Sequence, residues 1–251
     1  MAKQIRLDKF LSNSNFGTRK HTKKMIKNGL VTLNDKVIKV PDLCFDPSST
    51  TVKVDGEEVK YFNHIYLMIN KPKNYLCSVL DEEGYESVLN LLDPIYQKRA
   101  KLVGRLDVDT TGLLLLTDDG KLNNRLIHPH HMIEKEYEVT LNHEVPISLV
   151  EEFNKPIDIG QGEIASPSTL KDLEGNKCHI ILKEGKYHEI KRLFKVFHLE
   201  VVELKRVRLS FLTLGNLKLG KCRELDEEEI MKLKDITGLI EDEDEYNGSI
   251  L

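Results

Sequence analysis

The sequence has no long apolar run and no paired cysteines. No stretch approaches the roughly 18 apolar residues that a membrane-spanning helix needs, and the first residues lack the apolar segment of a secretory signal peptide. Its four cysteines, Cys44, Cys77, Cys178 and Cys222, stand far apart, so neither a zinc-binding spacing nor a redox pair is present. We therefore expect a cytoplasmic protein without a structural metal, whose cysteines are free thiols.

The small net charge of −4 conceals an uneven distribution of charge. Residues 1–60 hold twelve Lys or Arg against seven Asp or Glu, whereas residues 224–251 hold two against eleven. The basic end is where an anionic polymer is expected to dock. The acidic run at 241–245 is expected to be a solvated tail without a catalytic role. At 251 residues, the chain is long enough for one large core and a small module.

The first sixty residues predict a small module of two helices and short strands. Leu7, Phe10 and Leu11 recur at i, i+3 and i+4, as in a short amphipathic helix. A second helix is expected between Thr18, a suitable N-cap, and Gly29, a suitable stop, followed by strands near 30–33, 37–38 and 52–54. Four lysines give that helix a cationic stripe: Lys20, Lys23, Lys24 and Lys27. By pattern alone, such a stripe is more often a solvated face than a binding surface.

After a linker at about 58–64, the pattern changes to that of a larger domain over 65–235, with an acidic tail at 236–251. Strands are expected at 65–69, 101–103, 113–116, 137–141, 178–182, 201–204 and 217–219. Helices are expected at 86–92, 147–154, 187–197 and 226–234. Strands with interspersed helices indicate an α+β domain built on a mixed, mainly antiparallel sheet.

A polar loop bounded by Gly104 and Gly112 lies directly before the buried run 113–116, and Asp119-Gly120 after that run has the chemistry of a hairpin or turn. Both loop glycines can adopt positive φ or allow close backbone approach, so the carboxylates of Asp107 and Asp109 are expected in a fixed geometry. By spacing alone, two aspartates that only form a turn explain the pattern equally well.

Four segments resemble the motifs of the RsuA/RluA-type rRNA pseudouridine synthase family. They are Gly104-Arg105-Leu106-Asp107 with 109–113, Asn70-Lys71-Pro72 with Cys77-Ser78, Glu134-Lys135-Glu136-Tyr137, and the segment 184–194. The N-terminal module, about residues 1–60, resembles the S4 RNA-binding domain. The resemblance covers about residues 3–230 and is closest to the branch that modifies small-subunit (16S) rRNA. Glu189 departs from the family's usual Gln, and the acidic tail is an addition.

This resemblance implies an enzyme that isomerises a uridine in ribosomal RNA to pseudouridine, with Asp107 as the catalytic residue and with neither metal nor cofactor. Whether Asp107 attacks C1′ of the ribose or removes the 2′ proton stays open. Four residues are implied in the uracil pocket and in support of catalysis: Tyr137, which stacks on the uracil, Lys191, which pairs with the catalytic carboxylate, Leu193, which lines the pocket, and Arg105. The residues implied in RNA binding are Arg6, Arg19, Lys20, Lys23, Lys24, Lys27 and Arg192.

Several of these roles have alternatives. The alternative for Tyr137 is a core aromatic residue with a hydrated hydroxyl. Lys135 and Tyr137 lie two apart on the expected strand and therefore share one face of it. Arg105 either fills the space left by an extruded nucleotide or pairs with Asp109, which is expected to hold the loop through Thr111 or Arg105. Arg192 contacts either RNA phosphate or a neighbouring backbone, and an exchange of roles between Lys191 and Arg192 is a further alternative. His188 is left outside the catalytic set, because most histidines are structural.

The expected partner is ribosomal RNA or a ribosomal-subunit assembly intermediate, bound by a monomer away from membranes. One alternative target is large-subunit (23S) rRNA. An alternative of another class is a non-catalytic RNA-binding or ribosome-assembly factor. A glycosidase is a weaker third reading, because Asp107 and Asp109 are too close in one loop to flank a sugar.

Overall fold

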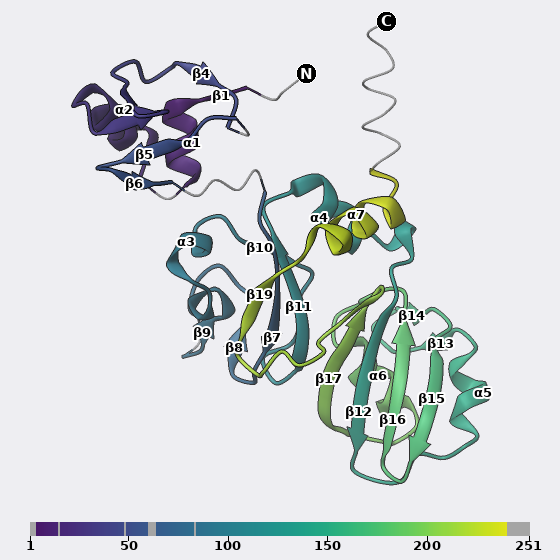
Figure 1. Cartoon of the computed structure of the whole chain (residues 1–251). Helices are drawn as coiled ribbons and strands as arrows, with labels where there is room; N and C mark the ends of the chain where they lie inside the picture. The colour runs from purple at the N-terminus through teal and green to yellow at the C-terminus, as the bar shows by residue number, and fades with distance from the viewer. Residues whose placement is uncertain (1–3, 15, 48, 60–63, 83, 240–251) are drawn as a thin grey trace, which may run out of the picture. The chain divides into compact units, whose positions relative to one another are not determined.

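The structure, a computed structural model, describes residues 4–14, 16–47, 49–59, 64–82 and 84–239. It divides into two compact units: Met1–His64 with Asp93–Arg99, and Ile65–Leu92 with Ala100–Leu251 (Figure 1). The assignment of 93–99 to the first unit does not follow from the sequence pattern. Within the described ranges, every helix is too short or too polar to cross a membrane.

The first unit contains the two expected helices, α1 (Leu7–Asn13) and α2 (Arg19–Lys27). Its strands are β1 (Ile5–Arg6), β2 (Val31–Leu33), β3 (Lys36–Val37), β4 (Cys44–Phe45), β5 (Val52–Val54) and β6 (Glu57–Glu58). Thr18 caps α2 by accepting a hydrogen bond from the N–H of His21, as expected. The apolar face of both helices packs on the strands, with Phe10 and Ile26 fully or almost fully buried.

The order in the main sheet of this unit is β3-β2-β5-β6, all antiparallel, and β1 pairs with β4. The short helix α3 (Pro94–Gln97) belongs to the same unit, and Arg99 just after it donates a hydrogen bond to the carbonyl of Asn13 (3.1 Å). Residues 60–63 of the expected linker lie outside the described residues. Val59, at its start, is buried in the core of the first unit.

The second unit is built on a nine-stranded sheet in the order β15-β16-β12-β17-β11-β7-β19, with β10 paired to β11 and β18 to β17. These strands are β7 (Tyr66–Lys71), β10 (Lys101–Val103), β11 (Thr111–Thr117), β12 (Lys135–Leu141), β15 (Thr169–Glu174), β16 (Lys177–Leu182), β17 (Val201–Leu209), β18 (Leu212–Thr213) and β19 (Cys222–Glu224). Only the β11 and β17 pair of this sheet is parallel among the described residues. The expected mixed, mainly antiparallel sheet is therefore confirmed.

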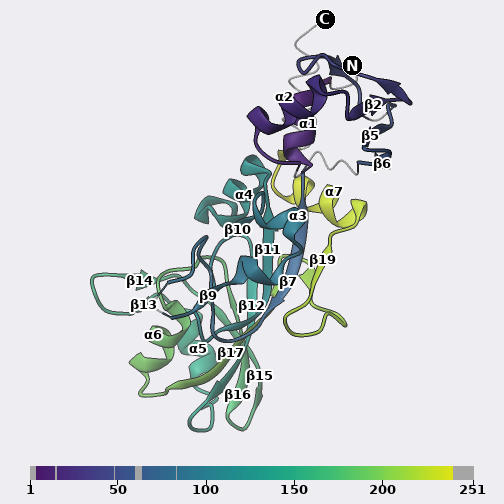
Figure 2. The same cartoon turned by 90° about the vertical axis from the view of Figure 1, so that its left-hand side faces the viewer.

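Two further short strand pairs lie beside this sheet: β8 (Tyr75–Leu76) with β9 (Glu86–Ser87), and β13 (Ile157–Asp158) with β14 (Ile164–Ala165). The helices are α4 (Gly120–Ile127), α5 (Leu149–Phe153), α6 (Glu189–Val196) and α7 (Glu227–Ile236), with 3-10 turns η1 (Val88–Leu91) and η2 (Pro129–His131). Helices α5 and α6 lie on one face of the half formed by β12, β15, β16 and β17 (Figures 1 and 2). Rings of Phe153 and Phe194 join these two helices, with centroids 5.1 Å apart.

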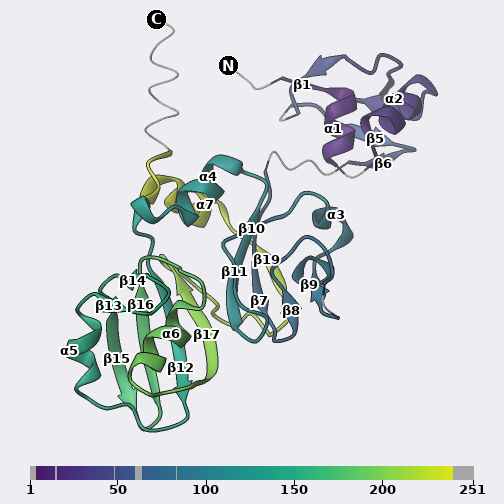
Figure 3. The ribbon, with the colours of Figure 1, turned by 180° about the vertical axis from the view of Figure 1, so that it is seen from behind.

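Helices α4 and α7 lie together at the end of the other half of the sheet (Figure 3). Leu122 and Leu126 of α4 and Leu233 of α7 share an apolar core with Leu113 and Leu115 of β11. Strand β11 is thus buried beneath helices on one side and paired with neighbouring strands along both edges. The apolar run that follows the loop 104–110 therefore anchors that loop to the centre of the unit.

Three sequence expectations in this unit are wrong. Asp119-Gly120 does not form a hairpin, because the Asp119 carboxylate accepts hydrogen bonds from the N–H groups of Lys121 and Leu122 and starts helix α4. Residues 217–219 form turns instead of a strand, and β19 begins only at Cys222. The helix expected at 86–92 is reduced to the 3-10 turn η1.

The expected start of the acidic tail at 236 is also wrong. Thr237 and Leu239 are buried, and Leu239 belongs to the apolar core that contains α4 and α7. Arg125 donates a hydrogen bond to the carbonyl of Thr237 (2.5 Å) and so holds this segment to α4. The packed part of the chain therefore reaches residue 239, and the acidic run at 241–245 lies outside the described residues.

Candidate active site

The loop between β10 and β11 has the fixed geometry that its glycines predict. Gly104 and Gly112 both have positive φ, at 71° and 107°. A Cβ atom on Gly112 would lie 2.2 Å from the carbonyl oxygen of Arg206, so only glycine fits where β11 meets β17. Inside the loop, the N–H of Thr110 donates to the carbonyl of Asp107 (3.0 Å) and closes a turn.

A fully buried lysine holds this turn through hydrogen bonds to its carbonyl groups. Lys71, the last residue of β7, has no exposed surface. Its Nζ donates to the carbonyls of Pro72 (3.1 Å), Asp107 (3.0 Å), Val108 (3.3 Å) and Thr110 (2.8 Å). Burial lowers the pKa of Lys71, but four converging carbonyl oxygens are the surroundings that an ammonium group needs in an interior. Lys71 therefore fixes the backbone on which the Asp107 carboxylate is mounted.

The segment after Lys71 supports the loop at two more points. The N–H of Leu106 donates to Cys77 Sγ (3.3 Å), and the N–H of Asn74 donates to the carbonyl of Val108 (2.8 Å). Burial raises the pKa of Cys77, which keeps the thiol neutral. The sequence assigns no separate role to Lys71 or Cys77, although a lysine that ends an otherwise apolar strand is a signal that could have pointed to Lys71.

One lysine pairs with both loop carboxylates. Lys191 Nζ of α6 lies 3.1 Å from Asp107 Oδ2 and 2.7 Å from Asp109 Oδ1. Burial alone would lower the pKa of Lys191, but its hydrogen bonds to Asp109 and Asp107 outweigh burial and raise it. Burial alone would raise the pKa of Asp109, but the hydrogen bond from Lys191 outweighs burial, and the pKa of Asp109 is lowered. The expected pairing of Lys191 with Asp107 is therefore present, in a geometry that favours charged groups.

The expected partners of Asp109 are wrong. Its carboxylate binds Lys191, whereas the hydroxyl of Thr111 donates to the carbonyl of Leu204 (3.4 Å). Arg105 is exposed and forms no ion pair with Asp109 among the described residues. His188, left outside the catalytic set, lies near Asp107, with Nε2 3.6 Å from Asp107 Oδ1.

Asp107 lines a cavity of about 80 Å³, and Tyr137, Lys191 and Arg105 are also part of its lining. Tyr137 of β12 is 8% exposed, so its ring forms a buried wall. Leu106, Leu182, Ile190 and Leu204 supply further apolar lining. A small cavity lined by an aromatic ring, several aliphatic side chains and a carboxylate can hold a planar ring beside that carboxylate.

The expectation that Leu193 lines this cavity is wrong. Leu193 is fully buried and is absent from the described residues of the lining, whereas Ile190 is present. Leu193 packs into the core beneath α6 instead.

The assignment of Arg192 to RNA is also corrected. Its guanidinium donates to the carbonyls of Ile159 (3.0 Å), Gly160 (2.6 Å) and Tyr187 (3.1 Å), and it pairs with Glu163. The neighbouring backbone is therefore its partner, as the alternative reading had it. Arg192 ties the turn between β13 and β14 to the start of α6.

Two charged groups near the cavity, the half-buried Lys135 and the buried Glu189, have shifted pKa values. Lys135 shares the Tyr137 face of β12, as expected, and burial with nearby Arg206 lowers its pKa to about 8. Glu189 is 3% exposed and lines the cavity, and burial raises its pKa to about 7, with the neighbouring Glu184 carboxyl adding to the rise. No sequence pattern distinguishes these two from ordinary surface charges.

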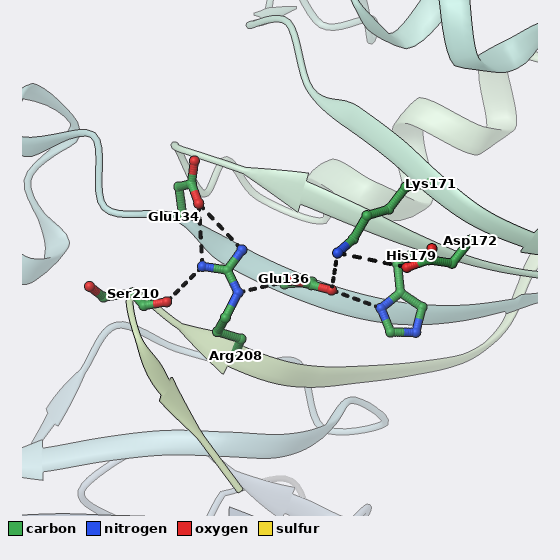
Figure 4. Close-up of polar contacts among 7 residues, drawn as sticks. All are labelled: Glu134, Glu136, Lys171, Asp172, His179, Arg208 and Ser210. Carbon is green, nitrogen blue, oxygen red and sulfur yellow. Dashed lines mark hydrogen bonds and ion pairs between the residues drawn. The ribbon is translucent and has the colours of Figure 1, made fainter.

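The opposite face of β12 carries a separate charge network centred on Glu136 (Figure 4). Its carboxylate accepts from Arg208 Nε (2.8 Å) and contacts Lys171 Nζ (3.0 Å) and His179 Nδ1 (2.9 Å). Glu136, Asp172 and His179 bring three possible metal ligands within 4.8 Å of one another. The Lys171 ammonium already lies 3.7 Å from Asp172 as well, so positive charge is supplied there by the protein.

This network predicts a loss of stability in acid. Burial by itself raises the pKa of Glu136, but hydrogen bonds from His179, Arg208 and Lys171 outweigh it and lower the value to about 2, from 4.5. A lowered folded-state pKa contributes stability that is present above about pH 4.5 and is lost as the pH falls towards 2, here about 3 kcal/mol.

Glu136→Gln should therefore destabilise the protein by a few kcal/mol at pH 7 and much less near pH 3, as measured by urea unfolding at both pH values. The matched control is Glu138→Gln, two positions along the same face of β12, where no ion pair is present among the described residues. An equal loss at both pH values would show that packing, and not charge, explains the effect.

In the first unit, the expected basic surface of α2 is exposed: Arg19, Lys20, Lys23, Lys24 and Lys27. Arg6 instead donates two hydrogen bonds to the buried Asp8 carboxylate, from Nε (3.1 Å) and Nη2 (2.9 Å). Lys23 lies 3.8 Å from the same carboxylate. Arg6 and Lys23 are thus partly neutralised, and the other four cations are available to a ligand.

Comparison with known proteins gives concordant matches. The family model described as RNA pseudouridylate synthase matches residues 65–195, and the S4 domain model matches 5–43. An uncharacterised RNA pseudouridine synthase of Aquifex aeolicus is 39% identical over 238 residues, covering 92% of this chain and 96% of the relative. Ribosomal small subunit pseudouridine synthase A of Vibrio cholerae is 37% identical, covering 91% and 99%. A crystal structure of a pseudouridylate synthase is 31% identical, with a TM-score of 0.65 and coverage of 91% and 99%.

Proposed function

The chain belongs to the RNA pseudouridylate synthase family and carries an S4 domain, and from this membership we propose that it converts a uridine of small-subunit (16S) rRNA into pseudouridine with Asp107 as the catalytic residue. The reaction breaks the bond between N1 and C1′, turns the uracil and joins C5 to C1′. The observation that carries the proposal is the Asp107 carboxylate in a cavity walled by Tyr137 and paired with Lys191 at 3.1 Å.

Either mechanism that the chemistry allows requires an ionised and immobile Asp107. As a nucleophile, its carboxylate attacks C1′ and releases the uracil; as a base, it removes the 2′ proton and a glycal forms. Lys191 Nζ, 3.1 Å from Asp107 Oδ2, supplies a counter-charge and orients the carboxylate. The four hydrogen bonds of Lys71 prevent the loop from moving during either step.

Two further residues of the cavity fit the handling of the base. The buried Tyr137 ring offers a face on which the uracil stacks while it turns, and we assign to its hydroxyl a part in removing the C5 proton. Arg105 is exposed at the same cavity, where its guanidinium plane can occupy the space that the extruded nucleotide leaves.

The small-subunit target is supported by relatives that bear that name, at 34% to 37% identity over about 90% of the chain. The large-subunit target is the alternative. A purely RNA-binding role is disfavoured, because Asp107, Tyr137 and Lys191 come from three separate elements and still line one cavity. We place the enzyme in the cytoplasm, as a monomer acting on rRNA or on an assembly intermediate.

The decisive experiment is to map pseudouridines in both ribosomal RNAs by carbodiimide primer extension, with and without the gene. We expect one stop in small-subunit rRNA to disappear when the gene is deleted and to return when it is restored. Restoration by the Asp107→Asn variant serves as the negative control. A stop lost only from large-subunit rRNA would refute the proposed target but not the enzyme class.

The basic helix α2 provides a separate prediction. Joint replacement of Lys20, Lys23, Lys24 and Lys27 by Ala should weaken RNA binding and flatten its salt dependence, because each lost phosphate contact removes about 0.7 to 0.9 from the log-log slope. Turnover on saturating RNA should be retained, since Asp107 is unchanged. Dissociation constants are measured over a salt series.

The matched control for this variant replaces four exposed lysines of the second unit: Lys155, Lys177, Lys218 and Lys221. The total charge change is the same, so a general electrostatic effect would weaken binding equally in both variants. A slope that falls only in the α2 variant would identify the stripe as the contact surface. An unchanged slope would leave it an ordinary solvated face.

A further inference from the structure

An exposed aromatic ring lies beside the cavity and has no part in the roles described above. The ring of Tyr187 stacks on that of His188, with centroids 3.8 Å apart and planes inclined by 17°. His188 lines the cavity, with Nε2 3.6 Å from Asp107 Oδ1. Tyr187 is 68% exposed even though His188 covers one side of its ring. The side of the ring that His188 does not cover therefore faces solvent, one stacked ring away from the group that contacts Asp107.

The backbone holds this ring pair in a fixed position. His188 adopts a left-handed conformation with φ of 49°, which is unfavourable for a residue with a side chain. The carbonyl of Tyr187 accepts from Arg192 Nη1 (3.1 Å), and the carbonyl of His188 accepts from the N–H of Arg192 (2.9 Å). The pair is thus tied to α6, the helix that also supplies Lys191.

Removal of a uridine from its stack leaves the adjacent nucleotide without a stacking partner. A fixed aromatic ring beside the reaction site can replace that partner, because every nucleobase has a π face and stacking on an aromatic side chain does not depend on sequence. We propose that the outer face of Tyr187 stacks on the base of the nucleotide next to the target uridine, with His188 supporting the ring from behind. This inference rests on the proposed function and adds to it a binding place for a neighbouring nucleotide.

The experiment uses the rRNA fragment around the mapped uridine, made in two versions with fluorescent 2-aminopurine at the nucleotide before or after it. Binding of the wild-type enzyme should quench one of the two labels, and Tyr187→Phe should quench it equally. Tyr187→Leu should leave it bright and weaken RNA affinity roughly tenfold. The loss should be the same at about 50 and about 200 mM salt, because stacking releases no counterions.

Ile147→Ala is the control, since Ile147 is an apolar side chain of the same unit with 77% exposure and no aromatic ring. It should preserve both quenching and affinity, and thermal unfolding should show that Tyr187→Leu is folded. Equal quenching by wild type and Tyr187→Leu, or no quenching of either label by wild type, would overturn the proposal. Conversion of the unlabelled fragment is followed separately, so a fragment that is quenched but never converted would count against the proposed function alone.

Discussion

Asp107→Asn should reduce product formation by several powers of ten while leaving the fold and RNA affinity close to those of the wild type. The substitution keeps the size of the side chain and much of its hydrogen bonding but removes the charge that either mechanism needs. Because each 1.4 kcal/mol or so of lost transition-state stabilisation is tenfold in rate, loss of an obligatory nucleophile or base has an effect of this size. The measurement is single-turnover conversion of a small-subunit rRNA fragment.

Asp109→Asn is the matched control, because Asp109 lies in the same loop and binds the same lysine at 2.7 Å. Its loss leaves Lys191 paired with Asp107 alone, 3.1 Å away, so the reacting carboxylate keeps its counter-ion. We expect a much smaller decrease in rate than for Asp107→Asn. Substantial activity of the Asp107 variant, or an equal loss in both, would show that the catalytic carboxylate is misassigned.

Around Asp107, only the residues that local pattern or the family resemblance indicates could be predicted from the sequence. The motif identifies Asp107 as the candidate, and the resemblance identifies Lys191 as its partner, which the structure places at 3.1 Å. The same lysine also binds Asp109; the resemblance does not indicate this second contact, and local pattern cannot, because α6 lies about eighty residues further along the chain. The error at Leu193 could not be avoided by helical period, because Glu189 and Lys191, also two apart on α6, both line the cavity, whereas Leu193 is fully buried.

In the fold, too, only the elements that depend on their own residues could be predicted from the sequence. Long apolar runs predict β7, β11 and β16 well, because a buried strand needs little beyond its own residues. Edge strand β15, Thr169–Glu174, mixes polar and apolar residues and has no comparable signal. The burial of Lys71 could not be predicted from its own strand, because the carbonyls that bind it come from a loop some 36 to 39 residues later in the chain.

Gly112→Ala should destabilise the second unit by about 3 kcal/mol and lower its Tm by roughly 10 °C. The new Cβ would meet the Arg206 carbonyl oxygen at 2.2 Å, and the φ of 107° is unfavourable for alanine. Since the obstacle is backbone, no side chain can move to relieve it. Strand β11 must shift away from β17, which breaks the parallel pairing of these two strands and displaces the loop that carries Asp107. Thermal unfolding and single-turnover rates report both effects.

Two other glycines separate the causes of this effect. Gly104→Ala faces a positive φ of 71° but meets only Ile127 Cγ2 at 3.8 Å, so it should lose about 1 kcal/mol through backbone strain alone. Gly120→Ala meets no atom within 4 Å, lies in α4 and should be neutral or slightly stabilising. If Gly112→Ala were no more harmful than Gly104→Ala, the close approach of β11 to β17 would not be what holds the loop with Asp107 in place, and the rigidity of that loop would have to come from Lys71.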